Sequence, residues 1–197
     1  MPRRSRAEML EETRAKLLTA GRRAFAEKGY AAASMDELTA QAGLTRGALY
    51  HHFGDKKGLL AAVVEVVDTE MATRAHQQVL ALKPASEWEA LVAEGLTYIE
   101  LALDPEIQRI VLKDGPAYLG DPSQWPSQSA CLAKSIDSLN SLMAQGVVKS
   151  VDAEAAARLI NGAALDAAQW VAASDAPEAA LPKAQAALKL LLDGLKA

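Results

Sequence analysis

The spacing of apolar residues around position 65 is the feature that most constrains the fold. The stretch "AAVVEVVDTEM", residues 61–71, is rich in valine, a residue that favours β-strands. Its apolar side chains nevertheless follow the i, i+1, i+4, i+5 pattern of a helix and not the alternation of a strand. The positions in this pattern are Leu59, Leu60, Val63, Val64, Val67 and Met71. They predict one long helix that runs to about Leu82, where Lys83-Pro84 ends it.

Start and stop signals predict helices in most of the remaining chain. Ser34 and Ser86 each stand three residues before a glutamate, which is the spacing of a capping box. Residues 113–127 are rich in Gly and Pro, which predicts an irregular connection with a short helical turn. The other predicted helices cover about 8–28, 35–42, 46–52, 86–103, 127–146, 152–173 and 177–195, with one more that begins at Pro105 behind the N-cap Asp104. The expected fold is therefore all-α.

Charge is distributed unevenly along the chain. Residues 1–60 hold 11 Lys and Arg against 7 Asp and Glu, whereas residues 61–197 hold 10 against 18. A basic first part on an acidic remainder is expected when only the first part meets a polyanion. Ordinary solvated surface charge explains the same counts, so charge alone leaves both explanations open.

Composition argues against several protein classes. The 197 residues contain no run near the roughly 20 apolar residues of a membrane span, and the basic N-terminus lacks the apolar segment of a signal peptide. Cys131 is the single cysteine, and we expect it to be buried and structural. The adjacent His51 and His52 point about 100° apart on a helix, so they are poorly placed to share a metal ion. We expect a cytoplasmic protein without catalytic residues, metal or cofactor.

The short predicted helices 35–42 and 46–52 form a candidate helix-turn-helix, with residues 43–44 as the turn. The side chains expected to face inward are Leu38, Leu44, Leu49 and Phe53. On another face of the second helix, Arg46 and Tyr50 flank Gly47, whose missing side chain lets the backbone approach a groove.

Cations surround this candidate reading face. The free amides at the start of the second short helix can receive a phosphate oxygen. Lys56 and Lys57, at the start of the next helix, can add phosphate contacts. Arg3, Arg4 and Arg6 are predicted to form a flexible arm that follows the DNA backbone or enters a minor groove.

Residues 10–64, and "TRGALYHHFGDKKGLL" above all, resemble the DNA-binding domain of the tetracycline-repressor-like (TetR) family of bacterial transcription regulators. The Leu-Tyr-His-His-Phe block, the lysine after it and the Ser34 cap all fall in register with that family. The resemblance implies a three-helix DNA-binding domain at residues 1–54, fused through a long helix to an effector-binding and dimerisation domain at 55–197.

The resemblance also implies roles for single residues. Arg46 and Tyr50, with Gly47 between them, would reach base edges, and the best partner of Arg46 is a guanine. Met35 would add an apolar contact to a thymine methyl group. The residues expected to contact phosphates are Ser34, Thr45, His51 and Lys56.

In the remaining helices, the resemblance implies a pocket for a small effector and a dimer interface. The candidate pocket residues are Met71, His76, Trp88, Tyr98, Tyr118 and Trp125, with Asn161 and Asp166 as possible polar contacts. The implied homodimer pairs the helices near 127–146 and 152–173. A neutral or cationic apolar effector is slightly favoured over an anion, because the body is acidic.

Three functions remain open at this point. The favoured one is a dimeric repressor that a small apolar effector releases from double-stranded operator DNA. The second is a DNA-binding dimer without a small-molecule sensor. The third, an all-α enzyme or carrier, predicts that duplex DNA does not bind and that Arg46 and Lys56 are dispensable.

Overall fold

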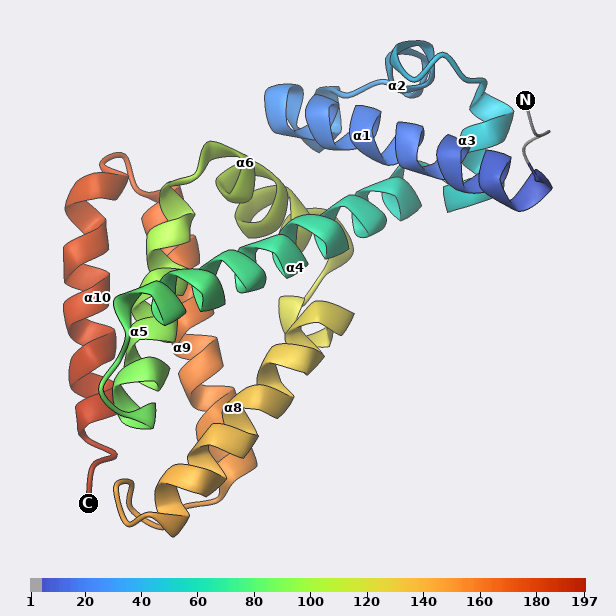
Figure 1. The fold of residues 1–197 in the computed structure, drawn as a ribbon. Coiled ribbons are helices and arrows are strands. Elements are labelled where there is room, and N and C mark those ends of the chain that lie inside the picture. Colours follow the sequence, from blue (N-terminus) through green and yellow to red (C-terminus); the bar gives the residue numbers. More distant parts are fainter. Residues whose placement is uncertain (1–4) are drawn as a thin grey trace.

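The computed structural model describes residues 5–197, which fold into a small helical head and a larger helical body (Figure 1). The all-α prediction is confirmed: within these residues the only β-type pairing is an isolated bridge between Val148 and Lys196. None of the helices in residues 5–197 combines the length and hydropathy of a membrane span. The α-helices are α1 (Arg6–Ala32), α2 (Met35–Gln41), α3 (Arg46–Phe53), α4 (Lys56–Leu82), α5 (Glu87–Glu100), α6 (Pro105–Ile107), α7 (Gly115–Leu119), α8 (Pro126–Ala144), α9 (Ala153–Ala173) and α10 (Pro177–Asp193).

The head consists of α1, α2 and α3, and α4 runs from it into the body (Figure 1). Leu17 of α1, Leu38 of α2 and Leu49 of α3 are fully buried together with Leu59 of α4. The valine-rich segment is helical as predicted, and α4 ends at Leu82. Because its first turns complete the core of the head, α4 belongs to both parts of the molecule.

Two local predictions at the end of α1 need correction. Gly29 has a φ of +77° and interrupts the helix, as its stop signal predicts, but helical structure continues to Ala32. Ser34 accepts from the Glu37 amide at 3.1 Å, which is one half of the predicted capping box. The other half does not form, because the Glu37 carboxylate accepts from Lys28 at 2.9 Å instead.

The stretch 113–127 is more helical than predicted. A π-helix, Gln108–Asp114, continues directly into α7, and a 3₁₀ turn at Pro122–Gln124 precedes α8. Pro116 lies in the first turn of α7, where a missing amide donor costs no hydrogen bond of that helix. The Gly-Pro pair therefore starts a helix here.

The junction between head and body rests on polar contacts. Arg22 of α1 donates to Glu106 of α6 through two nitrogens at 2.7 Å each, and to Glu70 of α4 at 2.9 Å. The backbone amide of Tyr30 donates to Asp114 at 2.7 Å, and the Tyr30 ring lies 4.3 Å from that of Tyr118. The head is thus fixed to α4 and also to the segment that follows α5.

Asp68 is a buried carboxyl group in the middle of α4, only 2 % exposed. Burial raises the pKa of Asp68, although Gln128 donates to it at 2.8 Å. Because the folded state holds this proton more tightly than the unfolded chain does, Asp68 contributes stability at low pH that is lost as the pH rises through its folded pKa. The free energy of unfolding that Asp68 contributes is therefore lower at neutral pH than at acidic pH.

We expect Asp68→Asn to raise the melting temperature at pH 7, since asparagine keeps the acceptor for Gln128 without the charge. Recovering about 1 kcal/mol would raise the melting temperature by roughly 2–4 °C in a protein of this size. Thermal unfolding between pH 4 and pH 8 should show the gain growing with pH. Asp137→Asn, at an exposed position of α8, is the control and should show no such trend. A gain that is independent of pH would contradict the role of the buried charge.

Candidate nucleic-acid interface and effector cavity

The outer face of α3 presents the side chains that the sequence assigns to base reading. Arg46, Gly47 and Tyr50 are exposed, and Tyr50 has 54 % of its surface accessible, whereas Leu49 on the opposite face is buried. Space around Gly47 is open apart from the Thr45 hydroxyl, 3.7 Å from where a Cβ would lie. Gly47 thus exposes the backbone of the first turn, as close approach to a DNA groove requires.

Arg46 is held by a carboxylate that the sequence analysis did not connect with it. Its Nε and Nη2 atoms donate to the two oxygens of Asp36, in the first turn of α2. These hydrogen bonds lower the pKa of Asp36 and raise that of Arg46, although both groups are exposed. Three N–H donors of the guanidinium, two on Nη1 and the second on Nη2, have no partner within residues 5–197.

The residues predicted to contact phosphates differ in whether their side chains are available to do so. Ser34 and Thr45 cap α2 and α3 through their oxygens, which leaves the hydroxyl protons available for donation. His51 is exposed on α3. The Lys56 ammonium instead lies 4.4 Å from the centre of the Tyr30 ring and is half-buried, which lowers its pKa.

The cations at the edges of the head are only partly described. Lys57, next to Lys56, is exposed and better placed than Lys56 to meet a phosphate. Of the predicted flexible arm, Arg3 and Arg4 lie outside the described residues. Arg6 forms the first turn of α1 behind the N-cap Ser5, so it does not belong to a flexible arm. Met35 is half-buried and packs against the head core.

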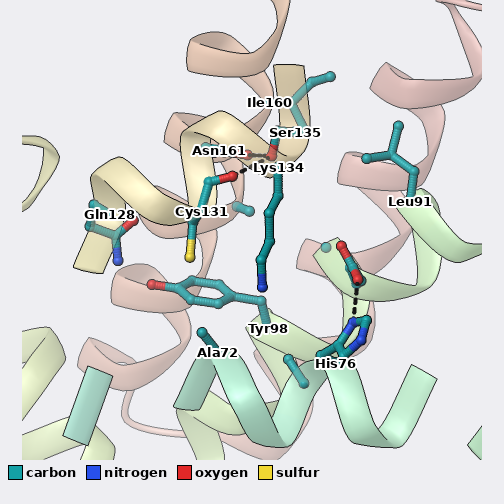
Figure 2. Close-up of a pocket in the computed structure, with 14 residues that line it drawn as sticks. Ala72, His76, Leu91, Tyr98, Gln128, Cys131, Lys134, Ser135, Ile160 and Asn161 are labelled. Carbon is teal, nitrogen blue, oxygen red and sulfur yellow. Dashed lines mark hydrogen bonds and ion pairs between the residues drawn. The ribbon is translucent and has the colours of Figure 1, made fainter. Parts of the chain in front are cut away.

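A cavity of about 120 Å³ lies in the body between α4, α5, α8 and α9 (Figure 2). Because α4 forms one wall and continues into the head, the cavity borders the element that both parts of the molecule share. Its apolar lining consists of Ala72, Ala75, Leu91, Gly95, Ile160 and Ala164. Its polar lining consists of His76, Glu94, Tyr98, Gln128, Cys131, Lys134, Ser135 and Asn161.

Of the six predicted effector residues, His76 and Tyr98 line this cavity. The other four lie elsewhere, since helical spacing identifies buried positions but not the cavity they border. Met71, Trp88 and Trp125 are buried in the core, and Tyr118 is exposed beside Tyr30. Of the two possible polar contacts, Asn161 lines the cavity and Asp166 is exposed.

The sequence analysis missed the wall formed by α8. Gln128, Lys134 and Ser135 each lie three or four residues from Cys131, which places them on the same side of a helix as Cys131. This polar stripe is the feature of the sequence from which the α8 wall of the cavity could have been predicted. Cys131 is half-buried as part of this wall, and burial raises the pKa of its thiol.

Several polar groups inside the cavity are paired, and one is not. His76 bonds Glu94 at 3.1 Å, and the Ser135 hydroxyl donates to Asn161 at 3.0 Å. The Tyr98 hydroxyl is buried and has no hydrogen-bond partner within residues 5–197. Burial also raises the pKa of Tyr98, so the neutral phenol is the form that meets a ligand.

The largest exposed apolar side chains of the later helices belong to α9 and α10. Leu159 and Trp170 of α9 are 75 % and 51 % exposed, and Leu190 and Leu191 of α10 are 75 % and 66 % exposed. Leu159 and Trp170 are eleven residues apart, which is close to three full helical turns, so they share one face. Within residues 5–197, α8 carries no comparable exposed side chain.

A helix-turn-helix head with an exposed second helix, fused to a separate helical body, defines a DNA-binding regulator. A model of bacterial regulatory proteins of the tetR family matches residues 17–63, and a model of the tetracyclin repressor-like C-terminal domain matches residues 88–195. The chain belongs to the TetR family of transcriptional regulators and is not an enzyme.

Similar proteins support this membership. A TetR-family transcriptional regulator from Pectobacterium atrosepticum has 50 % sequence identity, a TM-score of 0.86 and 98 % coverage of both chains. The Transposon Tn10 TetC protein of Escherichia coli is 27 % identical over 79 % of this chain and 78 % of its own length. The structure of RolR in complex with resorcinol shares the fold, with 22 % identity, a TM-score of 0.72 and coverage of 96 % and 90 %.

Proposed function

We propose that the protein is a homodimeric repressor that leaves its operator when a small molecule enters the cavity of the body. The observation that carries the proposal is the position of α4. Its first turns pack into the head core through Leu59, and its later turns line the cavity through Ala72, Ala75 and His76. A ligand that displaces α4 therefore changes the position of α3.

The DNA contacts proposed for each head are the residues of the α3 surface and its caps. Arg46 and Tyr50 would contact base edges, while Ser34, Thr45, His51 and Lys57 would donate to phosphates. Lys56 would need to leave the Tyr30 ring to do the same. The domain boundary at 54/55 remains our proposal and coincides with Asp55, the N-cap of α4.

The dimer interface is proposed to lie on α9 and α10. Two-fold symmetry is required to present two recognition helices to two half-sites. The sequence predicts an interface formed by residues 127–146 and 152–173. We do not include α8 in the proposed interface, because α8 has no stripe of exposed apolar side chains among the residues that the structure describes. Leu159 and Trp170 on α9, with Leu190 and Leu191 on α10, provide one instead.

Selection of duplexes from random DNA, followed by titration with candidate compounds, tests this function. Selected duplexes should bind with an affinity that falls steeply with salt, because phosphate contacts release counterions. At least one compound that fills the cavity should weaken the complex. A dimer without a sensor would bind DNA in the same way, but no compound in the cavity would alter its affinity.

We expect Arg22→Ala to weaken the response to an effector without abolishing either binding activity. Arg22 connects α1 with both α4 and α6, and it touches neither the cavity lining nor the exposed face of α3. An allosteric coupling is typically worth 5- to 150-fold in affinity, and we expect the variant to lose most of that factor. The measurement is operator affinity with and without saturating effector.

Arg23→Ala is the matched control for this prediction. Arg23 is the next residue on α1, and within residues 5–197 its guanidinium bonds only Glu27 of the same helix, at 3.0 Å. Its replacement should leave the coupling factor unchanged. Equal coupling in wild type and Arg22→Ala would show that the Arg22 contacts do not transmit the signal.

A further inference from the structure

We infer that the cavity between α4, α5, α8 and α9 selects a small carboxylic acid with a single ring, bound as its anion. The inference rests on the proposed function only for the consequence at the operator, because binding itself is a property of the cavity. Three features support it: the size of the cavity, an ammonium group without a counter-charge, and a buried phenol without a hydrogen-bond partner.

The size of the cavity limits the ligand to about one ring. Its volume of about 120 Å³ is close to the roughly 150 Å³ of an apolar protein cavity that accommodates benzene. Ala72 and Ala164 leave room on two sides, and Leu91 and Ile160 supply apolar walls. A compound with two fused rings would have to extend through the open side of the cavity or push these helices apart.

Lys134 supplies the charge that selects an anion. Its side chain extends from α8 towards Tyr98, as Figure 2 shows. Within residues 5–197, no carboxylate lies within 4.0 Å of its ammonium. The residue is exposed overall, which places the cation at the open side of the cavity. A ligand carboxylate can therefore pair with Lys134 while its ring enters the apolar part.

The carboxyl groups around the cavity are not available to bind a cationic ligand. The Glu94 carboxylate already bonds His76 at 3.1 Å. Asp68, behind the Tyr98 hydroxyl, accepts from Gln128, and its burial favours the uncharged form. The wall thus presents one unpaired cation and no unpaired exposed carboxylate. The acidic composition of the body slightly favours a neutral or cationic effector, whereas the cavity itself favours an anion.

The Tyr98 hydroxyl marks a second polar contact away from Lys134. It is buried without a partner within residues 5–197, and an unpaired buried polar group is costly. Its oxygen has almost no accessible surface, so a hydroxyl group on the ring, opposite the carboxylate, would exchange a hydrogen bond with it once the Tyr98 side chain turns towards the cavity. The inferred ligand class therefore includes hydroxylated ring acids, which should bind better than the unsubstituted acid.

Calorimetric titration of the full-length protein without DNA tests the inference. The probes are benzoate, its hydroxylated form 4-hydroxybenzoate, the neutral benzamide, the cationic benzylamine and the two-ring 1-naphthoate. At pH 7 we expect benzoate to bind about tenfold more tightly than benzamide or benzylamine, a factor typical of one added charged contact. We expect 4-hydroxybenzoate to bind more tightly still, and 1-naphthoate to bind weakly.

Two substitutions at Lys134 connect the preference to its ammonium. Lys134→Met keeps the aliphatic stem and should abolish the preference for benzoate over benzamide, while Lys134→Arg should retain it. Lys113→Met, at an exposed position on the π-helix outside the cavity, should change nothing. Tyr98→Phe should remove the advantage of 4-hydroxybenzoate over benzoate.

The outcomes separate this inference from the proposed function. Benzamide or benzylamine binding as tightly as benzoate, or no probe acid binding at all, would overturn the inference. So would an unchanged preference in Lys134→Met. An acid that binds as expected but leaves operator affinity unaltered would support the cavity chemistry and count against the repressor mechanism.

Discussion

Replacement of Leu190 by glutamate is expected to convert the homodimer into monomers and to weaken operator binding by at least about 100-fold. Leu190 is 75 % exposed on α10, beside the similarly exposed Leu191. In the proposed interface, a carboxylate there would be buried without a partner, which is strongly unfavourable. A monomer presents one α3 to one half-site and loses the gain of roughly 10²–10⁴ that linked binding provides.

Sedimentation of the variant measures the oligomeric state, and titration of a selected operator measures the affinity. Leu80→Glu is the matched control, because Leu80 is a similarly exposed leucine on a helix outside the proposed interface, α4. It should leave the dimer intact. Ala133→Glu, at an exposed position of α8, tests the interface that the sequence favoured. Dissociation by Ala133→Glu but not by Leu190→Glu would contradict the assignment to α9 and α10.

The fold could be predicted from the sequence because each helix carries its own local signals. Thr45 and Asp55 cap α3 and α4 as their positions predict, and Gly43 adopts the positive φ that the turn requires. These signals act over three or four residues, so they can be recognised without knowing the tertiary structure. The π-helix at Gln108–Asp114 has no comparable local signal, and it was missed.

The functional surfaces were harder to predict, for a different physical reason. Periodicity shows that Met71 and Trp88 are buried, but a cavity forms only where several helices fail to fill the space between them. The same limit applies to the dimer interface. An alanine-rich helix such as α9 is equally compatible with an internal position, and only the exposure of Leu159 and Trp170 distinguishes its outer face.

The pairing of Asp36 with Arg46 shows the same limit within the DNA-binding motif. Asp36 lies in the first turn of α2, and the structure joins it to the candidate reading residue of α3. Ten residues separate the two, so no helical spacing connects them. We propose that the pairing contributes to specificity, because it would fix the plane of the guanidinium before DNA binds.

Arg46→Ala is expected to lower operator affinity by roughly 10- to 100-fold and to relax selectivity at one base pair in each half-site. Arginine reads guanine through two parallel hydrogen bonds to O6 and N7, and alanine offers no replacement donor. Repeating the selection from random duplexes with the variant measures the loss of preference directly. Loss of affinity with unchanged base preference would identify Arg46 as a phosphate contact.

Asp36→Asn tests whether Asp36 orients the guanidinium of Arg46 for base reading. Asparagine keeps one acceptor but cannot accept from Nε and Nη2 through two oxygens, so the guanidinium gains freedom. If the pair positions Arg46, the variant should lose base preference at the same position as Arg46→Ala, even though removing a negative charge near DNA favours affinity at low salt. If Asp36 only repels phosphates, affinity should rise at every sequence and the preference should remain. The two effects are separable, because loss of positioning changes the ratio of affinities between DNA sequences, whereas loss of repulsion changes the affinity for all sequences alike.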